Sequence, residues 1–221
     1  MGGRKINWEW LINVMEKEAS NAPVFMVEKV LKSKHDIYKL IFVVLSSRTK
    51  DEMTIKALKK LTDKYKNPRD LAKADVKTIE HLIYGVGFYK TKAKRIKEIA
   101  TILCKNKCVV PKSYEKLIKL PGVGRKTANV ALNLIHGKKT IGVDTHVHRI
   151  ANRLGIVNTK TPKETEERLK KVVERKYWGK INRAFVAYGQ TICKPKKPKC
   201  RICGLKTICS YYKKLKGSNM I

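Results

Sequence analysis

The spacing of apolar residues predicts a chain built almost entirely from helices. Apolar side chains recur at helical spacing over residues 8–20 and 50–65, and the run over residues 36–46 is apolar enough for a buried helix. A strand would fit the β-branched residues of that run equally well, but the helical period of the segment that follows favours a helix. No strand alternation and no βαβ pattern stands out. The pattern therefore predicts an all-α fold.

Start and stop signals divide the rest of the chain. Pro23 breaks the first helix, and a linker is expected from there to Asp36. A polar turn over residues 46–51 joins two helices, with Ser47 or Thr49 as the expected N-cap. Further helices are predicted over residues 75–104 (two helices around a turn at Gly85), 113–119, 124–136, 144–154, 161–177 and 178–192.

The charge balance indicates a polyanionic partner. Lysine and arginine number 51 against 18 aspartates and glutamates, which leaves a net charge of +33. Nucleic acid is the first partner that such an excess predicts, and an anionic membrane surface is the second. Lysine enrichment also accompanies life at high temperature and can simply solvate a surface. Glutamate does not rise in step here, so ion pairs cannot absorb most of the lysines, and DNA binding is favoured.

Length and hydropathy favour a folded intracellular protein. A chain of 221 residues with 43% apolar content can bury a sizeable core, and its length allows one or two domains. It has no apolar run long enough to span a membrane, and residues 1–5 lack an apolar signal core. We therefore expect a cytoplasmic, nucleoid-associated protein with no membrane partner.

A Pro-Gly-x-Gly turn between two predicted helices is the most informative segment. Pro121 and Gly122 end a short helix and permit a tight reversal, and Gly124 starts the next helix with no side chain in the way. The unpaired N–H groups of such a helix start attract phosphate. Residues 113–136 therefore predict a helix-hairpin-helix that clamps a nucleic-acid backbone. Cations that are candidates for phosphate contact are Arg125, Lys138 and Lys139.

Two residues near this turn could carry chemistry. Lys126 lies in the first turn of the second helix, and eighteen residues later (144 minus 126) Asp144 stands at the start of the next predicted helix. A lysine amine beside a carboxylate, next to a phosphate clamp, indicates an amine nucleophile and its partner. An N-cap role is the simpler interpretation of Asp144 and would be preferred for that residue alone.

Six cysteines divide into a C-terminal group of four and a separate pair. Disulfides are disfavoured within the group of four, because the chain shows no signal peptide. Zinc usually takes two close C-x-x-C pairs, of which this loop has one. A [4Fe-4S] cluster accepts four thiolates on a compact loop, so spacing alone favours the cluster slightly over zinc. Cys104 and Cys108 are expected to be buried or idle thiols. The group of four is Cys193, Cys200, Cys203 and Cys209.

Three segments resemble the endonuclease III branch of the helix-hairpin-helix DNA glycosylases. They are Leu-Pro-Gly-Val-Gly-Arg-Lys-Thr-Ala over residues 120–128, Val-Asp-Thr-His over residues 143–146, and the four-cysteine loop. The similarity runs from about residue 35 to the last cysteine. It makes a [4Fe-4S] cluster the expected cofactor and implies two helical domains with a DNA-binding cleft between them. The domains implied are a helical bundle over residues 28–138 and a discontinuous cluster domain over residues 1–27 plus 139–221.

The resemblance also implies a function and roles for single residues. It implies a monomeric, bifunctional DNA glycosylase and AP lyase of base excision repair, which excises oxidised pyrimidines of the thymine-glycol type from duplex DNA and cuts 3′ to the abasic site by β-elimination. Lys126 would be the Schiff-base nucleophile and Asp144 its partner, on opposite walls of the cleft. Arg48 stands where the family has a glutamine that fills the gap left by the flipped base, and Phe88 matches a side chain inserted into the duplex. His146 is a candidate pocket residue.

Two other functions stay open. A monofunctional mismatch glycosylase of the same superfamily, which removes adenine or thymine, is the nearest alternative, but such relatives commonly lack a lysine at the position of Lys126. A non-catalytic DNA-binding protein would use the hairpin and the cluster only for architecture. It predicts that Lys126→Gln changes nothing beyond a modest loss of affinity.

Overall fold

The computed structural model describes residues 6–218, and every regular element in that range is a helix. The prediction of an all-α fold is confirmed. Residues 1–5, where no signal core was expected, and residues 219–221 lie outside the described part. None of the helices described has both the length and the apolar character needed to cross a membrane. The α-helices are α1 (Trp8–Glu18), α2 (Pro23–Leu31), α3 (Asp36–Leu45), α4 (Asp51–Lys64), α5 (Pro68–Lys73), α6 (Val76–Leu82), α7 (Tyr89–Lys105), α8 (Tyr114–Leu117), α9 (Arg125–His136), α10 (Thr145–Leu154), α11 (Pro162–Val172), α12 (Trp178–Thr191) and α13 (Ser210–Gly217), and the short 3-10 helices are η1 (Arg175–Tyr177) and η2 (Cys200–Ile202).

The chain divides into two compact units, each with a hydrophobic core of its own. One unit is Met26–Lys138, and the other joins Met1–Phe25 to Lys139–Ile221. Helices α3, α7 and α9 contribute to the first core, and α1, α10 and α12 contribute to the second. The N-terminal helix therefore shares a core with the C-terminal part of the chain, and the second unit is discontinuous in sequence.

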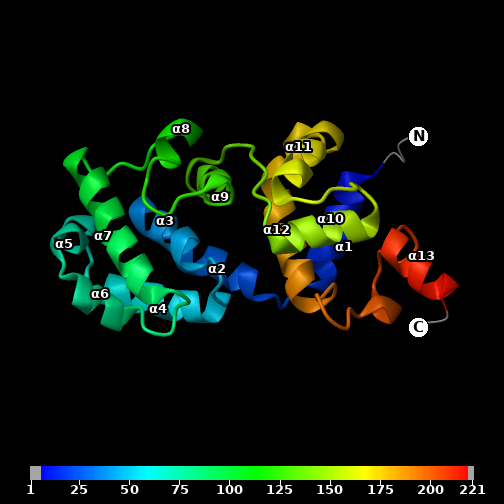
Figure 1. Ribbon diagram of the computed structural model, residues 1–221, viewed down its shortest axis with the longest axis horizontal. Coiled ribbons are helices and arrows are strands. Elements are labelled where there is room, and N and C mark those ends of the chain that lie inside the picture. The colour runs from blue at the N-terminus through cyan, green and yellow to red at the C-terminus, as the bar shows by residue number, and fades with distance from the viewer. Residues whose placement is uncertain (1–5, 219–221) are drawn as a thin grey trace. The chain divides into compact units, whose positions relative to one another are not determined.

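Helix α3 forms the centre of the unit Met26–Lys138. Eight of its ten residues are buried. A helix that is apolar all round needs partners on several sides. Helices α4, α7 and α9 supply them, and α5 and α6 pack on α7 in turn (Figure 1). The apolar run that begins at Asp36 is thus a buried helix, as its sequence predicts.

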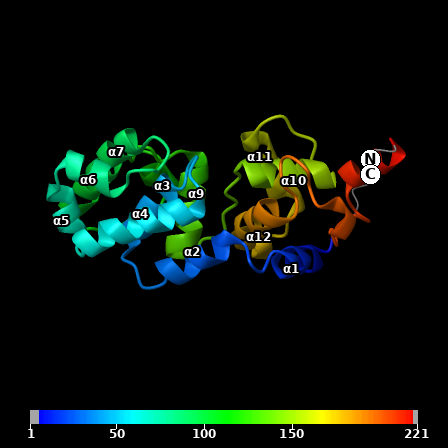
Figure 2. The ribbon, with the colours of Figure 1, turned by 90° about the horizontal axis from the view of Figure 1, so that it is seen from below.

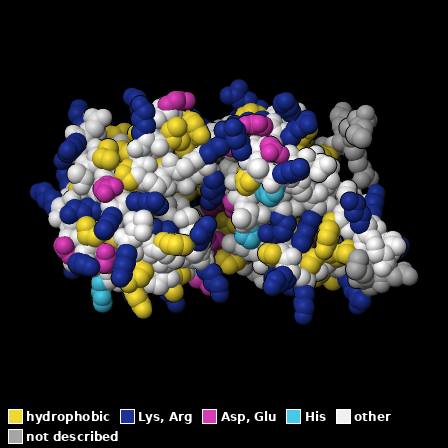
Figure 3. Space-filling view, viewed as in Figure 1, with side chains coloured by type: hydrophobic (Ala, Val, Ile, Leu, Met, Phe, Trp, Pro, Cys, Tyr) yellow, Lys and Arg dark blue, Asp and Glu magenta, His cyan; other side chains and the backbone are white. Residues whose placement is uncertain are grey.

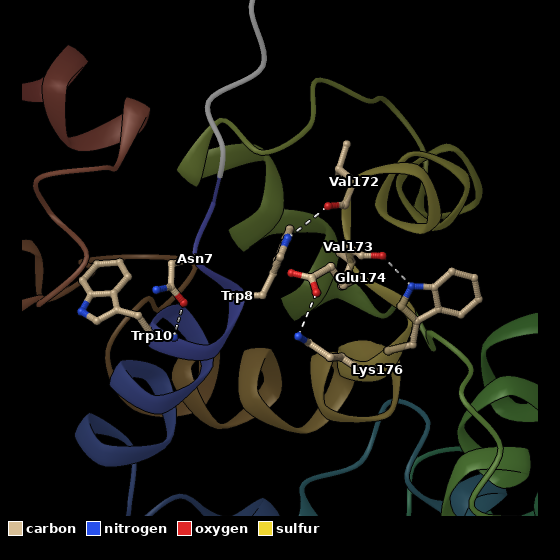
Figure 4. Close-up of polar contacts among 8 residues, drawn as sticks. Asn7, Trp8, Trp10, Val172, Val173, Glu174 and Lys176 are labelled. Atoms are coloured by element: carbon tan, nitrogen blue, oxygen red, sulfur yellow. Dashed lines mark hydrogen bonds and ion pairs between the residues drawn. The ribbon is translucent and has the colours of Figure 1, made fainter.

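Helix α12 takes the corresponding place in the other unit, where it packs against α1 and α10 (Figure 2). The N-terminal helix is fastened at its start by two hydrogen bonds (Figure 4). The Asn7 side chain accepts a bond of 3.0 Å from Trp10 N, and the buried Trp8 indole N–H donates to the Val172 carbonyl at 3.1 Å. An indole buried with its N–H satisfied contributes its full apolar area to the core.

Three helices were not predicted from the sequence, namely α2, α5 and α13. The expectation of a linker after Pro23 is wrong, because this proline begins α2 at the position where its missing N–H costs nothing. Helix α5 also starts with a proline and has only six residues, too few for a clear period. The helix predicted over residues 161–177 ends earlier, at Val172, and η1 follows it.

The expectation of idle thiols at Cys104 and Cys108 is wrong, because the two side chains form a disulfide with each other. Helix α7 ends at Lys105, and the chain then turns back at once. Lys107 and Cys108 both adopt left-handed backbone conformations, with φ of 57°, and the Cα atoms of the two cysteines lie 3.8 Å apart. A spacing of four residues does not by itself reveal such a reversal.

Candidate active site

The Pro-Gly-x-Gly segment forms a hairpin between α8 and α9 in the unit Met26–Lys138. Leu120 and Val123 are buried and anchor the turn in the core. Gly122 has a φ of 74°, a left-handed conformation that favours glycine. A Cβ at this position would also stand 2.6 Å from Arg95 Cδ. The turn therefore needs glycine at position 122 for its backbone conformation, and a side chain there would also displace the Arg95 side chain.

Helix α9 begins without a side-chain cap. Its N-cap is Gly124, which has an extended backbone, and a Cβ there would meet no atom within 4 Å. The first turn, which lies wholly within the described residues, contains no acidic side chain. An open, uncapped helix start presents N–H groups and the positive end of the helix dipole to an anion. The hairpin can thus receive a phosphate group at the start of α9.

Three cations surround this helix start. Arg125 is exposed, and Lys126, the second residue of α9, is half-buried. The third cation, Arg95 on α7, was not singled out from the sequence, and its guanidinium Nε and Nη1 lie within 3.4 Å of where a Cβ of Gly122 would stand. No sequence signal marks Arg95, because its position depends on how α7 packs against the hairpin.

Asp144 lies in the other unit, at the start of α10. Its Oδ1 accepts hydrogen bonds from His146 N at 2.9 Å and from Val147 N at 3.0 Å, so Asp144 is the N-cap of this helix. The half-buried carboxylate is therefore held in one orientation, and its Oδ2 takes no part in the two capping bonds. A carboxylate fixed in this way can still act as a proton acceptor or as a negative charge near a cation.

His146 packs against α12. Its Nδ1 lies 3.2 Å from Arg149 Nη2, and a Cβ at Gly189 would stand 2.3 Å from the same imidazole nitrogen. Because Gly189 has no side chain, the half-buried imidazole of His146 can occupy this space. These contacts give His146 a packing role, and its role in a pocket stays a prediction.

The two residues predicted to enter the duplex lie side by side in the unit Met26–Lys138. Arg48, between α3 and α4, and Phe88, just before α7, both have left-handed backbones, with φ of 52° and 59°. The guanidinium carbon of Arg48 is 5.4 Å from the centre of the Phe88 ring. Phe88 is 64% exposed. A large aromatic ring in solvent on a strained backbone is typical of a functional position.

A buried lysine that the sequence analysis did not single out supports these two loops. Lys92 is only 3% exposed. Its ammonium donates to the Leu45 carbonyl at 2.7 Å, to the Ser47 carbonyl at 2.6 Å and to Thr49 Oγ1 at 3.1 Å. Burial, and after it the charge of Arg95, lowers the pKa of Lys92 from 10.5 to about 8.

Thr49 completes the connection between the two loops. Its Oγ1 also accepts a hydrogen bond from Gly87 N at 3.1 Å. Gly87 has no room for a side chain, because a Cβ there would stand 2.6 Å from the Arg48 carbonyl oxygen. The prediction that Ser47 or Thr49 caps the next helix is wrong, since the N-cap of α4 is Lys50 and it makes no side-chain capping bond.

The four C-terminal cysteines line one pocket, together with apolar side chains of α10 and α12. Burial raises the pKa of Cys203 and Cys209, and burial and the charges of the other three cysteines raise the pKa of Cys200. The hydroxyl of Tyr188 lies 3.0 Å from the Cys203 sulfur. Among the described residues, no group of three or more histidines, cysteines and acidic residues is placed to hold a metal ion. The [4Fe-4S] cluster at these cysteines therefore stays a prediction.

Two arginines of α10 hold the cysteine loop. Arg149 donates to the Cys193 carbonyl at 2.8 Å. Arg153 donates to the carbonyls of Lys194 at 2.7 Å and Pro195 at 2.9 Å, and its Nη1 lies 3.5 Å from the Cys193 sulfur. The helix that Asp144 caps thus also fixes the backbone of the loop. Neither arginine was predicted, although their spacing of four residues puts both on one face of α10.

Lys138 and Lys139 do not belong to the hairpin. They follow the C-terminal end of α9, after Gly137, whereas the hairpin lies at the N-terminal end of the same helix. Both side chains are exposed. Lys and Arg side chains are spread over the visible face of each unit and outnumber the acidic side chains there, so positive charge is not confined to one stripe (Figure 3).

Comparison with known proteins agrees with this arrangement. Residues 41–175 match the HhH-GPD superfamily of base excision DNA repair proteins. The chain is 52% identical over 176 residues to an endonuclease III of Thermotoga maritima. The aligned region covers 79% of this chain and 83% of that protein. Two solved structures share its fold at 30% identity, a non-covalent endonuclease III–DNA complex and a trapped endonuclease III–DNA covalent intermediate. Their TM-scores are 0.81 and 0.79, with coverage of 95% and 94% of this chain and 96% of each of those chains.

The helical fold, the hairpin that can receive phosphate and the match over residues 41–175 together define the class of this protein. It is a base excision DNA repair protein of the HhH-GPD superfamily. Within that class, the chain belongs to the endonuclease III family. The family predicted from the sequence is confirmed, and so is the function at the level of its class, a DNA glycosylase and lyase of base excision repair.

Proposed function

We propose that this enzyme excises oxidised pyrimidines, such as thymine glycol, from duplex DNA and then cuts the strand 3′ to the abasic site. The observation that carries the proposal is the placement of a half-buried lysine, Lys126, in the first turn of a helix whose start is open to phosphate. The same element that can bind the DNA backbone thus carries an amine. A trapped covalent complex with DNA among the related structures supports an enzyme that reacts through such a group.

DNA binding follows from the hairpin and from the charge. A phosphate at the start of α9 would accept hydrogen bonds from backbone N–H groups, with Arg125 and Arg95 as neighbouring cations. The excess of 33 positive charges adds sequence-independent attraction. Arg48 and Phe88 would enter the duplex beside the lesion and occupy the space left by the extruded base.

The chemistry proposed for Lys126 and Asp144 begins with the neutral amine. The amine attacks C1′ of the deoxyribose, the bond from C1′ to the base breaks, and the base leaves with the electron pair and takes up a proton. As the bond to the base breaks, the charge of the Asp144 carboxylate stabilises the developing cationic sugar. The carboxylate then accepts the proton that the newly bonded nitrogen of Lys126 loses. The bond between C1′ and the ring oxygen O4′ then breaks, O4′ takes up the proton held by Asp144, and an imine forms between Lys126 and C1′.

Strand cleavage follows from the imine. The cationic imine acidifies C2′, a base removes a C2′ proton, and the bond between C3′ and its phosphate oxygen breaks. Hydrolysis of the imine returns the free amine of Lys126 and releases an unsaturated aldehyde on the 3′ end, with a 5′ phosphate on the other fragment. The complete cycle leaves the protein as it began, so Lys126 can act again.

The residues of the cysteine loop fit a [4Fe-4S] cluster. Four thiols line one partly apolar pocket, and the Tyr188 hydroxyl and the Arg153 guanidinium lie next to two of the sulfurs, as suits thiolates bound to iron. When bound, such a cluster would supply a cross-link between distant parts of the loop. The exposed cations that the loop would then hold in place are Lys194, Lys196, Lys197, Lys199 and Arg201. Iron and acid-labile sulfide analysis of the purified protein tests this assignment.

Borohydride trapping on a duplex with a thymine glycol or an abasic site tests the chemistry. The enzyme is expected to form a covalent adduct, and Lys126→Gln is expected to form none. Lys105→Gln removes an equal charge from an exposed lysine at the end of α7 and should trap normally. Failure of the unaltered enzyme to form an adduct would refute the lyase mechanism, and an adduct with Lys126→Gln would refute the role of that lysine.

Asp144→Asn separates the chemical role of Asp144 from its capping role. Asparagine caps a helix as well as aspartate does, so the start of α10 should be retained. Both base release and strand cleavage are expected to slow, while the affinity for DNA changes little. A variant that reacts at the normal rate would show that capping is the only contribution of Asp144.

A further inference from the structure

Lys92 is a buried cation that takes no part in the proposed chemistry. Its ammonium is buried at the base of two loops, with three oxygen acceptors between 2.6 and 3.1 Å, contributed by Leu45, Ser47 and Thr49. All three acceptors are neutral groups. A charge buried without an acidic partner is expensive, and an apolar side chain of similar length would fill the same space at lower cost.

The buried charge of Lys92 fixes the backbone around Arg48, because two of its acceptors lie on either side of that residue. Ser47 and Thr49 are its chain neighbours, so Lys92 binds the backbone immediately before Arg48 and the hydroxyl immediately after it. Arg48 itself has a φ of 52°, which a non-glycine residue holds only when its surroundings enforce it. The ammonium of Lys92 therefore stabilises this strained turn.

The second loop is held by the same group of atoms. Thr49 Oγ1, which accepts from Lys92, also accepts from Gly87 N, the residue before Phe88. Phe88 has a φ of 59° and is the N-cap of α7. Lys92 is the fourth residue of that helix. The Lys92 ammonium and the Thr49 hydroxyl thus connect the loop that carries Arg48 to the loop that carries Phe88.

We infer that Lys92 is a positioning residue for base extrusion, which holds the Arg48 and Phe88 loops in the geometry that enters the duplex. This inference rests on the proposed function, in which those two side chains occupy the space of the extruded base. Lys92 itself does not touch DNA, since it is 3% exposed and its donors are engaged. It is equally unsuited to be the nucleophile, for the same reasons.

The central experiment compares two substrates. Lys92→Met keeps an unbranched side chain, one atom shorter than that of lysine, and removes the ammonium. On a thymine-glycol duplex, where the base must be extruded, the variant should release base about 10- to 100-fold more slowly than the unaltered enzyme. On single-stranded DNA with a pre-formed abasic site, where nothing has to be extruded, borohydride trapping should stay within about twofold, because the chemical groups are intact. Equal rates on the duplex, or an equal loss on both substrates, would overturn the inference.

A double variant tests whether Lys92 acts through Phe88. If it does, Lys92→Met combined with Phe88→Ala should be no slower on the duplex than the slower single variant. Multiplied losses would show that Lys92 acts by another route. Thr49→Val removes the shared hydroxyl from a half-buried loop position and should reproduce the duplex-specific loss. It also serves as the test variant if Lys92→Met does not fold, as judged by circular dichroism.

A binding measurement separates this inference from the proposed chemistry. A duplex with 2-aminopurine next to a stable abasic analogue should gain fluorescence when the enzyme unstacks the base step. Lys92→Met should show a smaller gain at saturating protein, while Lys126→Gln should show the normal gain. The outcome does not depend on lyase activity, so a failed trapping experiment would refute the chemistry and leave this test standing. An undiminished gain with Lys92→Met would refute the positioning role.

Discussion

The buried ammonium of Lys92 predicts a pH-dependent term in the stability of the unit Met26–Lys138. The pKa of Lys92 falls from 10.5 to about 8 in the folded protein, chiefly because of burial. Below about pH 8 the side chain is charged in both the folded and the unfolded chain, and the full cost of burying the charge is present. Between about pH 8 and 10.5 the folded protein has released the proton and the unfolded chain still binds it. The unfolded chain then binds more protons, so the free energy of unfolding rises with pH.

The size of this term follows from the two pKa values. The gap between 10.5 and about 8 corresponds to about 3 kcal/mol at full titration. Methionine does not titrate, so the stability of the unaltered protein relative to Lys92→Met should rise by up to about 3 kcal/mol from about pH 7 to pH 10.5. The pH-dependent contributions of other groups cancel in this comparison.

Urea unfolding at several pH values measures the difference. Far-UV circular dichroism follows helices of both units, whereas tryptophan fluorescence follows only the unit without Lys92, because Trp8, Trp10 and Trp178 all lie there. The pH-dependent difference is expected in the dichroism transition. Lys94→Met, at an exposed position of α7, is the matched control and should lack it. A difference that stays constant or shrinks as pH rises, or one seen only in the tryptophan signal, would refute the reasoning.

Three further substitutions test the close contacts described above. Gly87→Ala puts a Cβ 2.6 Å from the Arg48 carbonyl and should cost about 1–3 kcal/mol of stability by urea unfolding, and a neutral result would show that the two loops do not touch. In Gly124→Ala the new Cβ meets no atom within 4 Å, so stability should change by less than about 0.5 kcal/mol. The affinity for DNA in a filter-binding assay should fall, and an unchanged affinity would count against a phosphate at this helix start. Trp8→Phe removes the 3.1 Å bond to the Val172 carbonyl and should cost about 1 kcal/mol in the tryptophan-detected transition, whereas no loss would mean that water replaces the indole.

The elements that the sequence predicts well are those with a local cause. Helix α3 is apolar all round, so its burial follows from composition alone. The hairpin follows from the glycine and proline spacing, because only glycine accepts the φ of Gly122 without strain. Helix α2 was missed because a proline can begin a helix as readily as it can end one.

The features that the sequence does not predict depend on tertiary contacts. Arg48 and Phe88 are 40 residues apart (88 minus 48), and their contact exists only because α3 and α7 pack together. Lys92 carries a weak signal, since it lies four residues before Ile96 on the buried face of α7, but a lysine in an apolar stripe does not reveal its acceptors. The roles of Lys126 and Asp144 in catalysis stay predictions.

The shared core of α1 and the C-terminal helices has a consequence for biosynthesis. A ribosome delivers α1 well before its packing partner α12, which emerges only after the whole of Met26–Lys138 has been made. The inner unit can therefore mature while the chain is still growing, whereas the nascent N-terminal helix must wait in solution or on a chaperone. Truncated chains released by stalled ribosomes would expose that waiting helix, which makes them natural targets for proteolytic quality control.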